Sequence, residues 1–439
     1  MGKVERIFTV LGAFFANQKN RVGFIIMAAS FIPLGLMSLY DELRYAIGYK
    51  HTSIFAQADD RFADLLEAAM SYKSVTSELV GSGQIAGWSK LYLHYLTVTA
   101  TYYGIPLTHY NMPPFGALFH IAVAELLVAF DPTTALWASI ALYVVLAVFA
   151  SWLLRRFFDV SKMDQVAVGF VFLLSYPAFY MITRGNLLAG YTCIFLAIYT
   201  LTALKGQYRW WGLICLSIAI NIRPNTMVFG LLELVVVNNR CERTILGVVL
   251  FAVLLAIVSR LIVQTVDPGF TIENFMKALR VYNWAYAEGS MGTDWNCSLY
   301  GTTRVLRDTL GLQPTYDESW YFVVRMIGAL SVLATLYLAM ARRLTMVTAT
   351  FLATALSALF TPVFAFYHML EFSVPLVVVV AAKGKATEIS RDKVLVFATS
   401  LFCLCPFDAR RTIYPLFIFA AMVTLMVRVY RQEPGSIPK

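Results

Sequence analysis

The sequence predicts an all-α, polytopic membrane protein with about 12 transmembrane helices. The first observation is composition: 59% of residues are hydrophobic, only 14% are charged, and the mean hydropathy is +0.67. Soluble domains carry roughly 25% charged residues, so a chain of this length and so few charges would not stay soluble. The second is a succession of apolar runs, and the third is the placement of basic residues between them.

The apolar runs are numerous, and two long polar stretches interrupt them. The runs cover residues 22–39, 113–130, 134–154, 165–182, 187–204, 210–222, 225–237, 244–265, 319–341, 344–362, 367–382, 393–407 and 413–429. The polar stretches are 40–112 and 266–318. Several runs are shorter than the roughly 20 residues of a full span, so their number alone does not fix the number of crossings.

Basic residues orient the chain, because cytoplasmic loops are enriched in Lys and Arg. They precede the first run and recur at 342–343, 383–393 and 428–431, which predicts that both ends are cytoplasmic. Stretches 40–112 and 266–318 then face the outside, and we expect short interfacial helices in them. The run 22–39 has no small-residue cleavage site after it, so it is predicted to be the first span.

Two cytoplasmic ends require an even number of crossings, so one of the thirteen runs does not cross independently. Residues 210–237 could form one span that is broken at Arg223-Pro224, because proline interrupts a helix. That choice leaves Arg155-Arg156 and Lys205 outside, against the charge rule. The alternative, in which 113–130 is re-entrant, restores those charges to the cytoplasm, and the sequence leaves both open.

Charge and cysteine content exclude several classes of protein. The net charge of +9 comes from residues between apolar runs, which indicates membrane anchors and no nucleic-acid partner. Four of the six cysteines lie within apolar runs, where Cys behaves as a small hydrophobic residue. We therefore expect no disulfide framework and no metal site. No glycine-rich phosphate loop is visible, so no nucleotide or other cofactor is predicted.

Acidic residues gather in the first outer stretch, at Asp59, Asp60 and Asp64. On a helix Asp60 and Asp64 would share one face. A carboxylate there could act as general base toward a sugar hydroxyl. Such a group is more often part of a solvated loop helix.

Four further motifs lie at predicted helix ends. They are Tyr110–Phe115, Thr183–Asn186 followed by Asn221–Asn225, Asn296–Gly301, and Thr361–His368. Arg184 and Arg223 interrupt apolar runs, and a guanidinium can bind phosphate oxygens bidentately, although an arginine at a membrane boundary can also simply snorkel. A lone His such as His368 is more often structural than catalytic.

The order of these five features resembles that of glycosyltransferase family 87 in the GT-C superfamily, whose members use polyprenyl-phosphate sugars. The family shows an acidic first outer loop, a Tyr-Pro-Pro helix entry, an Arg-Gly-Asn element, a Lys-Pro element, a Ser-Leu-x-Gly stretch and a late Ser-Pro element before a His. The corresponding residues are Asp60 and Asp64, Tyr110 to Pro114, Arg184 to Asn186, Arg223-Pro224, Ser298 to Gly301, and Thr361-Pro362 with His368.

The resemblance covers about residues 55–375, with some departures. Arg223 replaces the usual Lys, Thr361 replaces Ser, and Asn111-Met112 lengthens the Tyr-Pro-Pro entry. Asp41 opens a stretch that resembles the Asp-Glu-x-Arg-Tyr-Ala motif of lipid A aminoarabinose transferases, another GT-C branch.

The resemblance implies a single membrane domain over 1–439. Its GT-C-like catalytic module would be 22–265, with first outer loop 40–112, followed by second outer loop 266–318 and C-terminal helices 319–429. The implied activity is inverting transfer of a mannose-like hexose or a pentose from a polyprenyl phosphate to a lipid-linked or glycan acceptor. It would occur at the outer face of the cytoplasmic membrane, without metal or cofactor.

The resemblance also implies the roles of the site residues. Asp60 would be the base, with Asp64, Asp59 and Asp41 as competitors, and His368 would assist. Arg184, Asn186, Arg223, Tyr110, Ser298 and Asp41 would bind the substrates.

Two other functions share the composition. A transporter or flippase would use intramembrane charges such as Arg223 and Glu233, but transporters often have repeated halves, and no internal repeat is visible. An O-antigen polymerase-like protein would also use lipid-linked sugars. Such proteins usually have their long outer loop late in the chain, whereas the first is the longest here.

Overall fold

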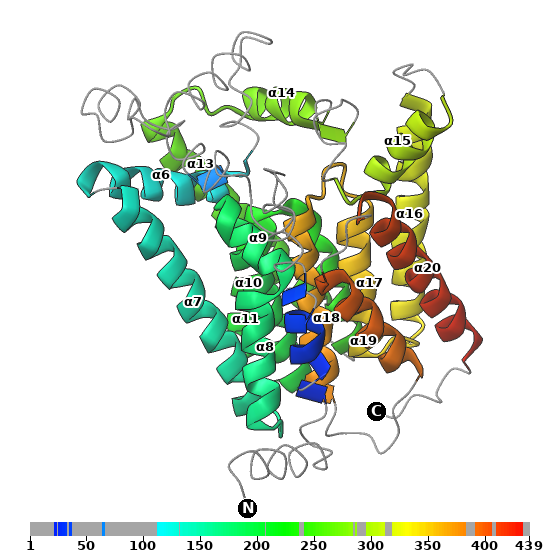
Figure 1. Ribbon diagram of the computed structural model, residues 1–439. Helices are drawn as coiled ribbons and strands as arrows, with labels where there is room; N and C mark the ends of the chain where they lie inside the picture. Colours follow the sequence, from blue (N-terminus) through cyan, green and yellow to red (C-terminus); the bar gives the residue numbers. More distant parts are fainter. Residues whose placement is uncertain are drawn as a thin grey trace, which may run out of the picture.

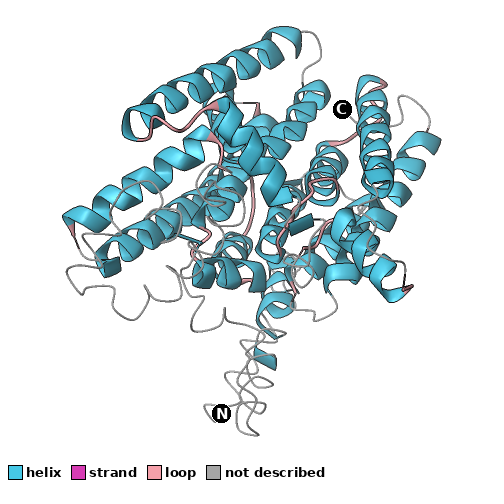
Figure 2. Ribbon diagram, turned by 90° about the horizontal axis from the view of Figure 1, so that it is seen from above, coloured by secondary structure: helices cyan, strands magenta, loops and turns pink. Residues whose placement is uncertain are grey.

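The computed structural model describes residues 22–23, 25–32, 35–36, 64–65, 112–130, 132–206, 208–236, 241–283, 286–287, 296–311, 318–382, 391–405 and 410–432. These residues form helices joined by short connections (Figure 2). The described part of the chain contains no β-strand beyond an isolated bridge between Asn296 and Ala365.

The helices follow one another with few residues between them. They are α6 (Pro114–Ala129), α7 (Pro132–Phe157), α8 (Lys162–Leu174), α9 (Tyr176–Arg184), α10 (Leu187–Lys205), α11 (Arg209–Ile222), η2 (Pro224–Leu231), α12 (Leu232–Val236), α13 (Cys241–Val266), α14 (Ile272–Asn283), α15 (Leu299–Thr309), α16 (Glu318–Met340), α17 (Met346–Leu359), η5 (Phe366–Phe372), α18 (Ser373–Ala381), α19 (Arg391–Leu404) and α20 (Arg410–Arg431).

Among the described residues, six helical segments are long and apolar enough to cross a membrane. They are Thr134–Phe157, Lys162–Arg184, Leu187–Lys205, Gly247–Val266, Tyr321–Met340 and Ile413–Arg431. Shorter apolar helices pack between them, including α11 and α17. The architecture is thus that of a helical membrane protein, in agreement with the predicted class.

Helix α10 lies at the centre of the bundle, where it packs against α7, α11 and α18 (Figure 1). Its sequence is apolar on all sides, as expected for a helix surrounded by others. The outer helices instead expose large apolar side chains, for example Trp137 on α7, Leu250 on α13 and Phe322 on α16. In a bilayer these side chains would contact lipid.

The chain reverses direction at Arg223-Pro224. The guanidinium of Arg209, at the start of α11, pairs with Glu233 in α12, and the Tyr199 hydroxyl donates to the same carboxylate at 2.8 Å. A continuous helix would separate positions 209 and 233 by about 36 Å, so residues 210–237 form a hairpin. The expectation of one long broken span is therefore wrong, because the proline break permits a full reversal.

Helix α6 lies across one end of the bundle, at a steep angle to α7 (Figure 1). We call this end, which is uppermost in Figure 1, the site end. Helix α14 also lies across it. The predicted second outer loop 266–318 thus contains two short helices, α14 and α15. Of the predicted first loop 40–112, only 64–65 and 112 are described.

Candidate functional site

Asp64 is held at the site end by residues from three other elements. The Arg184 guanidinium donates to Oδ1 of Asp64 at 2.7 Å, and the Asn186 amide donates to Oδ2 at 3.0 Å. The same amide donates to the Tyr367 hydroxyl at 2.8 Å. These side chains are 120 or more residues from Asp64 in sequence, so the tertiary fold alone brings them to it.

The turn between α9 and α10 explains how two neighbouring residues reach one carboxylate. Gly185 has φ 78° and ψ 12°, the left-handed conformation that commonly ends a helix. Its N–H donates to Ile182, and the N–H of Asn186 donates to Met181, which satisfies the carbonyls at the end of α9. Because α10 starts immediately afterwards, Arg184 and Asn186 are both presented at the site end.

Burial changes the acidity of Asp64. The Asp64 side chain is 16% exposed, and its desolvation raises the pKa to about 6, although hydrogen bonds from Asn186 and Tyr367 act in the opposite direction. A carboxyl group with this pKa is ionised at neutral pH, and it is more basic than an ordinary Asp. It is therefore suited to accept a proton.

A second cluster surrounds Arg223 at the apex of the hairpin. Nη1 of Arg223 pairs with Glu371, which is fully buried, and donates to Nδ1 of His368 at 2.9 Å. A guanidinium has only donors, so Nδ1 of His368 carries no proton and the neutral ring holds its proton on Nε2. The Nε2–H group can then donate to a ligand. The ring of Phe364 lies 5.4 Å from the guanidinium carbon.

The sequence around Arg223 forms this apex for local reasons. The residue before a proline avoids the helical region, and Arg223 is extended, with φ −138° and ψ 98°. Pro224 then starts η2, where its missing N–H costs nothing. Asn225 donates to the Ser357 hydroxyl at 2.7 Å, and Ser357 donates to Glu371 at 3.0 Å. The apex is thus tied to α17 and to η5.

The two clusters are neighbours through η5. Tyr367 contacts Asp64 and His368 contacts Arg223, and the two adjacent rings meet edge to face with centroids 4.5 Å apart. Both side chains are partly exposed. The site therefore combines a basic carboxylate, two guanidinium groups and a neutral imidazole in one connected network.

Residues 296–301 support this network from the side. Oδ1 of Asn296 accepts from the N–H of Phe364 at 3.0 Å, and its Nδ2 donates to the Pro362 carbonyl at 2.9 Å. The buried Ser298 hydroxyl also donates to Pro362, at 3.1 Å. A Cβ on Gly301 would lie 2.4 Å from the Asn296 carbonyl oxygen, so glycine is needed for this close approach.

Five of the predicted site residues lie within the described network. Arg184, Asn186, Arg223, His368 and Asp64 meet at the site end. For Ser298, also predicted to bind substrate, the structure shows a buried side chain whose hydroxyl donates to the Pro362 carbonyl and accepts from the N–H of Gly301. Asp60, Asp59, Asp41 and Tyr110 lie outside the described residues.

Sequence reasoning did not single out Tyr367, Glu371 or Ser357 as site residues. A carboxylate inside an apolar run, as at Glu371, is a signal of function by itself, because a charge there is costly. Tyr367 and Ser357 give no such signal, since both residue types are common in membrane helices. Among the described residues, no group of three or more His, Cys, Asp or Glu side chains could hold a metal ion.

Comparison with protein-family models, with curated proteins and with solved structures found no match for this chain.

Proposed function

We propose that this protein is a membrane glycosyltransferase that moves a sugar from a polyprenyl phosphate to an acceptor hydroxyl. One observation supports this above all: the Asp64 carboxylate, with its raised pKa, belongs to the same network as the Arg223 and Arg184 guanidinium groups. Sugar transfer from a lipid phosphate needs a base for the acceptor and cations for the departing phosphate.

The proposed topology has twelve crossings. They are the first run 22–39, α7, α8 with α9, α10, α11, η2 with α12, α13, α16, α17, η5 with α18, α19 and α20. Helix α6 then lies at the surface, and both chain ends are cytoplasmic. This arrangement puts Arg155, Arg156 and Lys205 at the end opposite the site, so it obeys the positive-inside rule and makes the site end the outer one.

In the proposed reaction Asp64 accepts the proton of the acceptor hydroxyl. The acceptor oxygen forms a new bond to the anomeric carbon, while the bond from that carbon to the phosphate oxygen breaks on the opposite face. The anomeric configuration is inverted, and the electron pair leaves with the polyprenyl phosphate. Arg184 and Asn186 hold the carboxylate in place, since each of them contacts a different carboxylate oxygen.

The leaving phosphate would be stabilised by Arg223 and His368. Among the described residues, both contacts of Arg223 to Glu371 and His368 use Nη1, which leaves Nη2 to bind a phosphate oxygen. The Nε2–H of His368 supplies a neutral donor beside it. Glu371 fixes the guanidinium and keeps the empty site close to neutral.

The test is release of polyprenyl phosphate from a panel of lipid-linked sugars by the purified protein in detergent. Asp64→Asn is nearly isosteric but cannot accept the proton, so turnover should fall by roughly 10²-fold or more. Asp159→Asn, an exposed carboxylate at the opposite end, is the matched control and should keep turnover.

Asp60→Asn and Asp41→Asn complete the series. Near-normal turnover in Asp64→Asn beside an inactive Asp60→Asn or Asp41→Asn would move the base to that residue and leave the reaction class intact. If no polyprenyl phosphate is released from any lipid-linked sugar, the reaction class is contradicted. Movement of such a lipid across a vesicle membrane without sugar transfer would indicate a transporter.

A further inference from the structure

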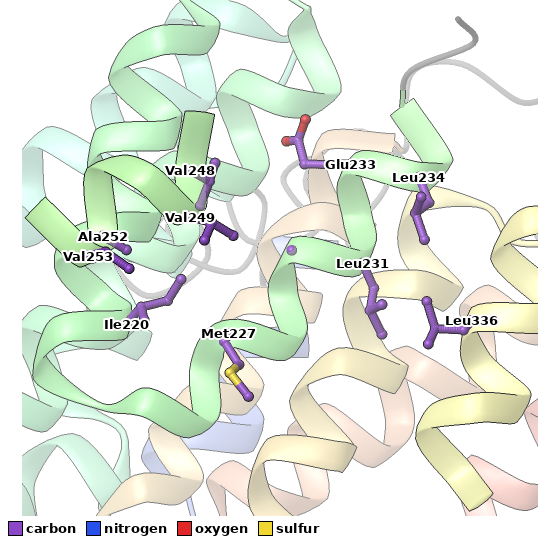
Figure 3. Close-up of a pocket in the computed structure, with 11 residues that line it drawn as sticks. Ile220, Met227, Leu231, Glu233, Leu234, Val248, Val249, Ala252, Val253 and Leu336 are labelled. Atoms are coloured by element: carbon purple, nitrogen blue, oxygen red, sulfur yellow. The ribbon is translucent and has the colours of Figure 1, made fainter. Parts of the chain in front are cut away.

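An apolar cavity of about 460 Å³ lies between the hairpin and the helices α13 and α16. One wall comes from α13, with Val248, Val249, Ala252 and Val253, and Ile220 of α11 lies beside it (Figure 3). The opposite wall comes from η2, α12 and α16, with Met227, Leu231, Leu234 and Leu336. We call this cavity the hairpin groove.

The hairpin groove opens on the apolar surface of the protein. Three of its lining side chains are exposed: Met227 is 66% exposed, and Val249 and Val253 are each 50% exposed. The surface of α13 next to them also exposes large apolar residues, such as Leu250 and Leu254. A hydrocarbon chain could therefore enter the groove sideways from the bilayer.

The one acidic residue in the lining does not offer a polar contact to a chain in the groove. Glu233 is fully buried, and its two carboxylate oxygens are engaged by Arg209 and by Tyr199. This ion pair lies at the end of the hairpin opposite Arg223. The groove thus favours a purely apolar ligand and is bounded at that end by a satisfied polar cluster.

The other end of the hairpin groove comes within a few residues of Arg223 in the chain. Ile220 precedes Arg223 by three residues and Met227 follows it by four. Each separation corresponds to about one helical turn, or ~5 Å. From Met227 to Leu234 the groove follows η2 and α12 for about 12 Å. A lipid whose phosphate bound Arg223 could therefore place the first part of its chain in the groove.

We propose that the hairpin groove binds the isoprenoid chain of a polyprenyl phosphate whose phosphate is held by Arg223. This proposal rests on the proposed function, because it takes the same lipid as donor. Burial of the chain adds apolar contact area to a phosphate contact that is common to all prenyl phosphates. The groove therefore gives the site a preference for long isoprenoid chains over short ones.

Gly230 offers a way to fill the groove without disturbing the fold. It lines the cavity, and a Cβ built on it meets no atom within 4 Å. The matched control is Gly247 on α13, where a Cβ also meets nothing within 4 Å but which is not part of the lining. Val253→Trp fills the groove from the facing wall and provides a second, independent variant.

The experiment measures binding of undecaprenyl phosphate and of dimethylallyl phosphate to the full-length protein in detergent. The single isoprene unit of dimethylallyl phosphate only spans the ~5 Å between Arg223 and the groove, so this probe does not enter it. The wild type and Gly247→Leu should bind the long chain at least tenfold more tightly than the short one. Gly230→Leu and Val253→Trp should lose most of this preference, through weaker binding of undecaprenyl phosphate and unchanged binding of dimethylallyl phosphate.

Unchanged chain-length preference in both groove variants would overturn the proposal. So would equal competition by dioleoyl phosphatidate, because it would show that the groove takes acyl chains. The same samples are assayed for release of polyprenyl phosphate from lipid-linked sugars, which separates the two proposals. Binding that depends on the groove, without this release, refutes the reaction alone. Release together with binding that does not depend on the groove refutes the groove alone.

Discussion

At the scale of single residues, Asp64 decides how the site responds to pH. Its pKa is raised to about 6 because burial penalises the charged form more than the hydrogen bonds of Asn186 and Tyr367 favour it. The folded protein therefore takes up a proton at Asp64 more readily than the unfolded chain, whose Asp has a pKa near 4.

We expect kcat/KM to fall about tenfold per pH unit below pH 6, because protonated Asp64 cannot act as base. The contribution of Asp64 to the free energy of unfolding should follow the opposite trend. The folded protein binds the proton more tightly, so this stabilisation is fully present below about pH 4 and is lost as the pH rises through 6. A pH–rate profile together with thermal unfolding in detergent checks both, and Asp64→Asn should remove the stability trend. A rate that is constant down to pH 5 would contradict the role of Asp64.

The Arg223–Glu371 pair raises a separate question, which is whether it supports the fold or the reaction. The Glu371 side chain is fully buried and that of Arg223 is 12% exposed. Removing one partner leaves an uncompensated charge, whereas replacing both by apolar residues can restore stability.

Glu371→Leu should therefore lower stability by roughly 3–5 kcal/mol. The double variant Arg223→Met/Glu371→Leu should recover much of that loss but should show no turnover, because the phosphate contact is gone. Unfolding midpoints and release of polyprenyl phosphate from lipid-linked sugars, measured on the same preparations, test this. An active double variant would exclude Arg223 from phosphate binding.

At the scale of elements, two helix ends have the same geometry but different surroundings. Gly185 ends α9 with φ 78° and Gly206 ends α10 with φ 74°, so alanine at either position must adopt a left-handed conformation. This costs about 1–2 kcal/mol. Gly185 lies between Arg184 and Asn186, whereas Gly206 follows Lys205 at the opposite end of the bundle.

Gly185→Ala and Gly206→Ala should thus lose similar stability, but only Gly185→Ala should lose activity, since it shifts the two side chains that hold Asp64. Gly185→Asn should be milder, because Asn tolerates the left-handed region. Unfolding midpoints and kcat/KM separate the two effects. Equal loss of activity in both alanine variants would show that the turn has no specific part in the site.

At the scale of the whole molecule, the proposed topology depends on the reversal at Arg223-Pro224 and on α6 lying at the surface. In that topology the Tyr208 connection and the α15 end are on opposite sides of the membrane. Tyr208 is 63% exposed and Leu310 is 70% exposed, so both are suitable for labelling.

In a background without native cysteines, Leu310→Cys should react with an impermeant thiol reagent from outside. Tyr208→Cys should react only after permeabilisation. Labelling of Tyr208→Cys from outside would contradict the proposed orientation.

The site itself was predictable in part. The breaks at Arg184–Asn186 and Arg223-Pro224 are visible in sequence because charged residues, glycine and proline interrupt apolar runs, and each break reaches the site end. The partners of these residues were not predictable. Tyr367 and Ser357 contribute through contacts with residues more than 130 positions away or on another helix, and no local pattern encodes such contacts.

The sequence by itself determined that the chain is a helical membrane protein, because apolar content and the spacing of charges are properties of composition and order. It also determined where the helices break, since proline and glycine act locally on the backbone. Only the tertiary structure decided that the segment after Arg223 turns back and that Asp64 meets Arg184 and Asn186. A break permits many directions, and the packing of α10, α12 and η5 around it selects one.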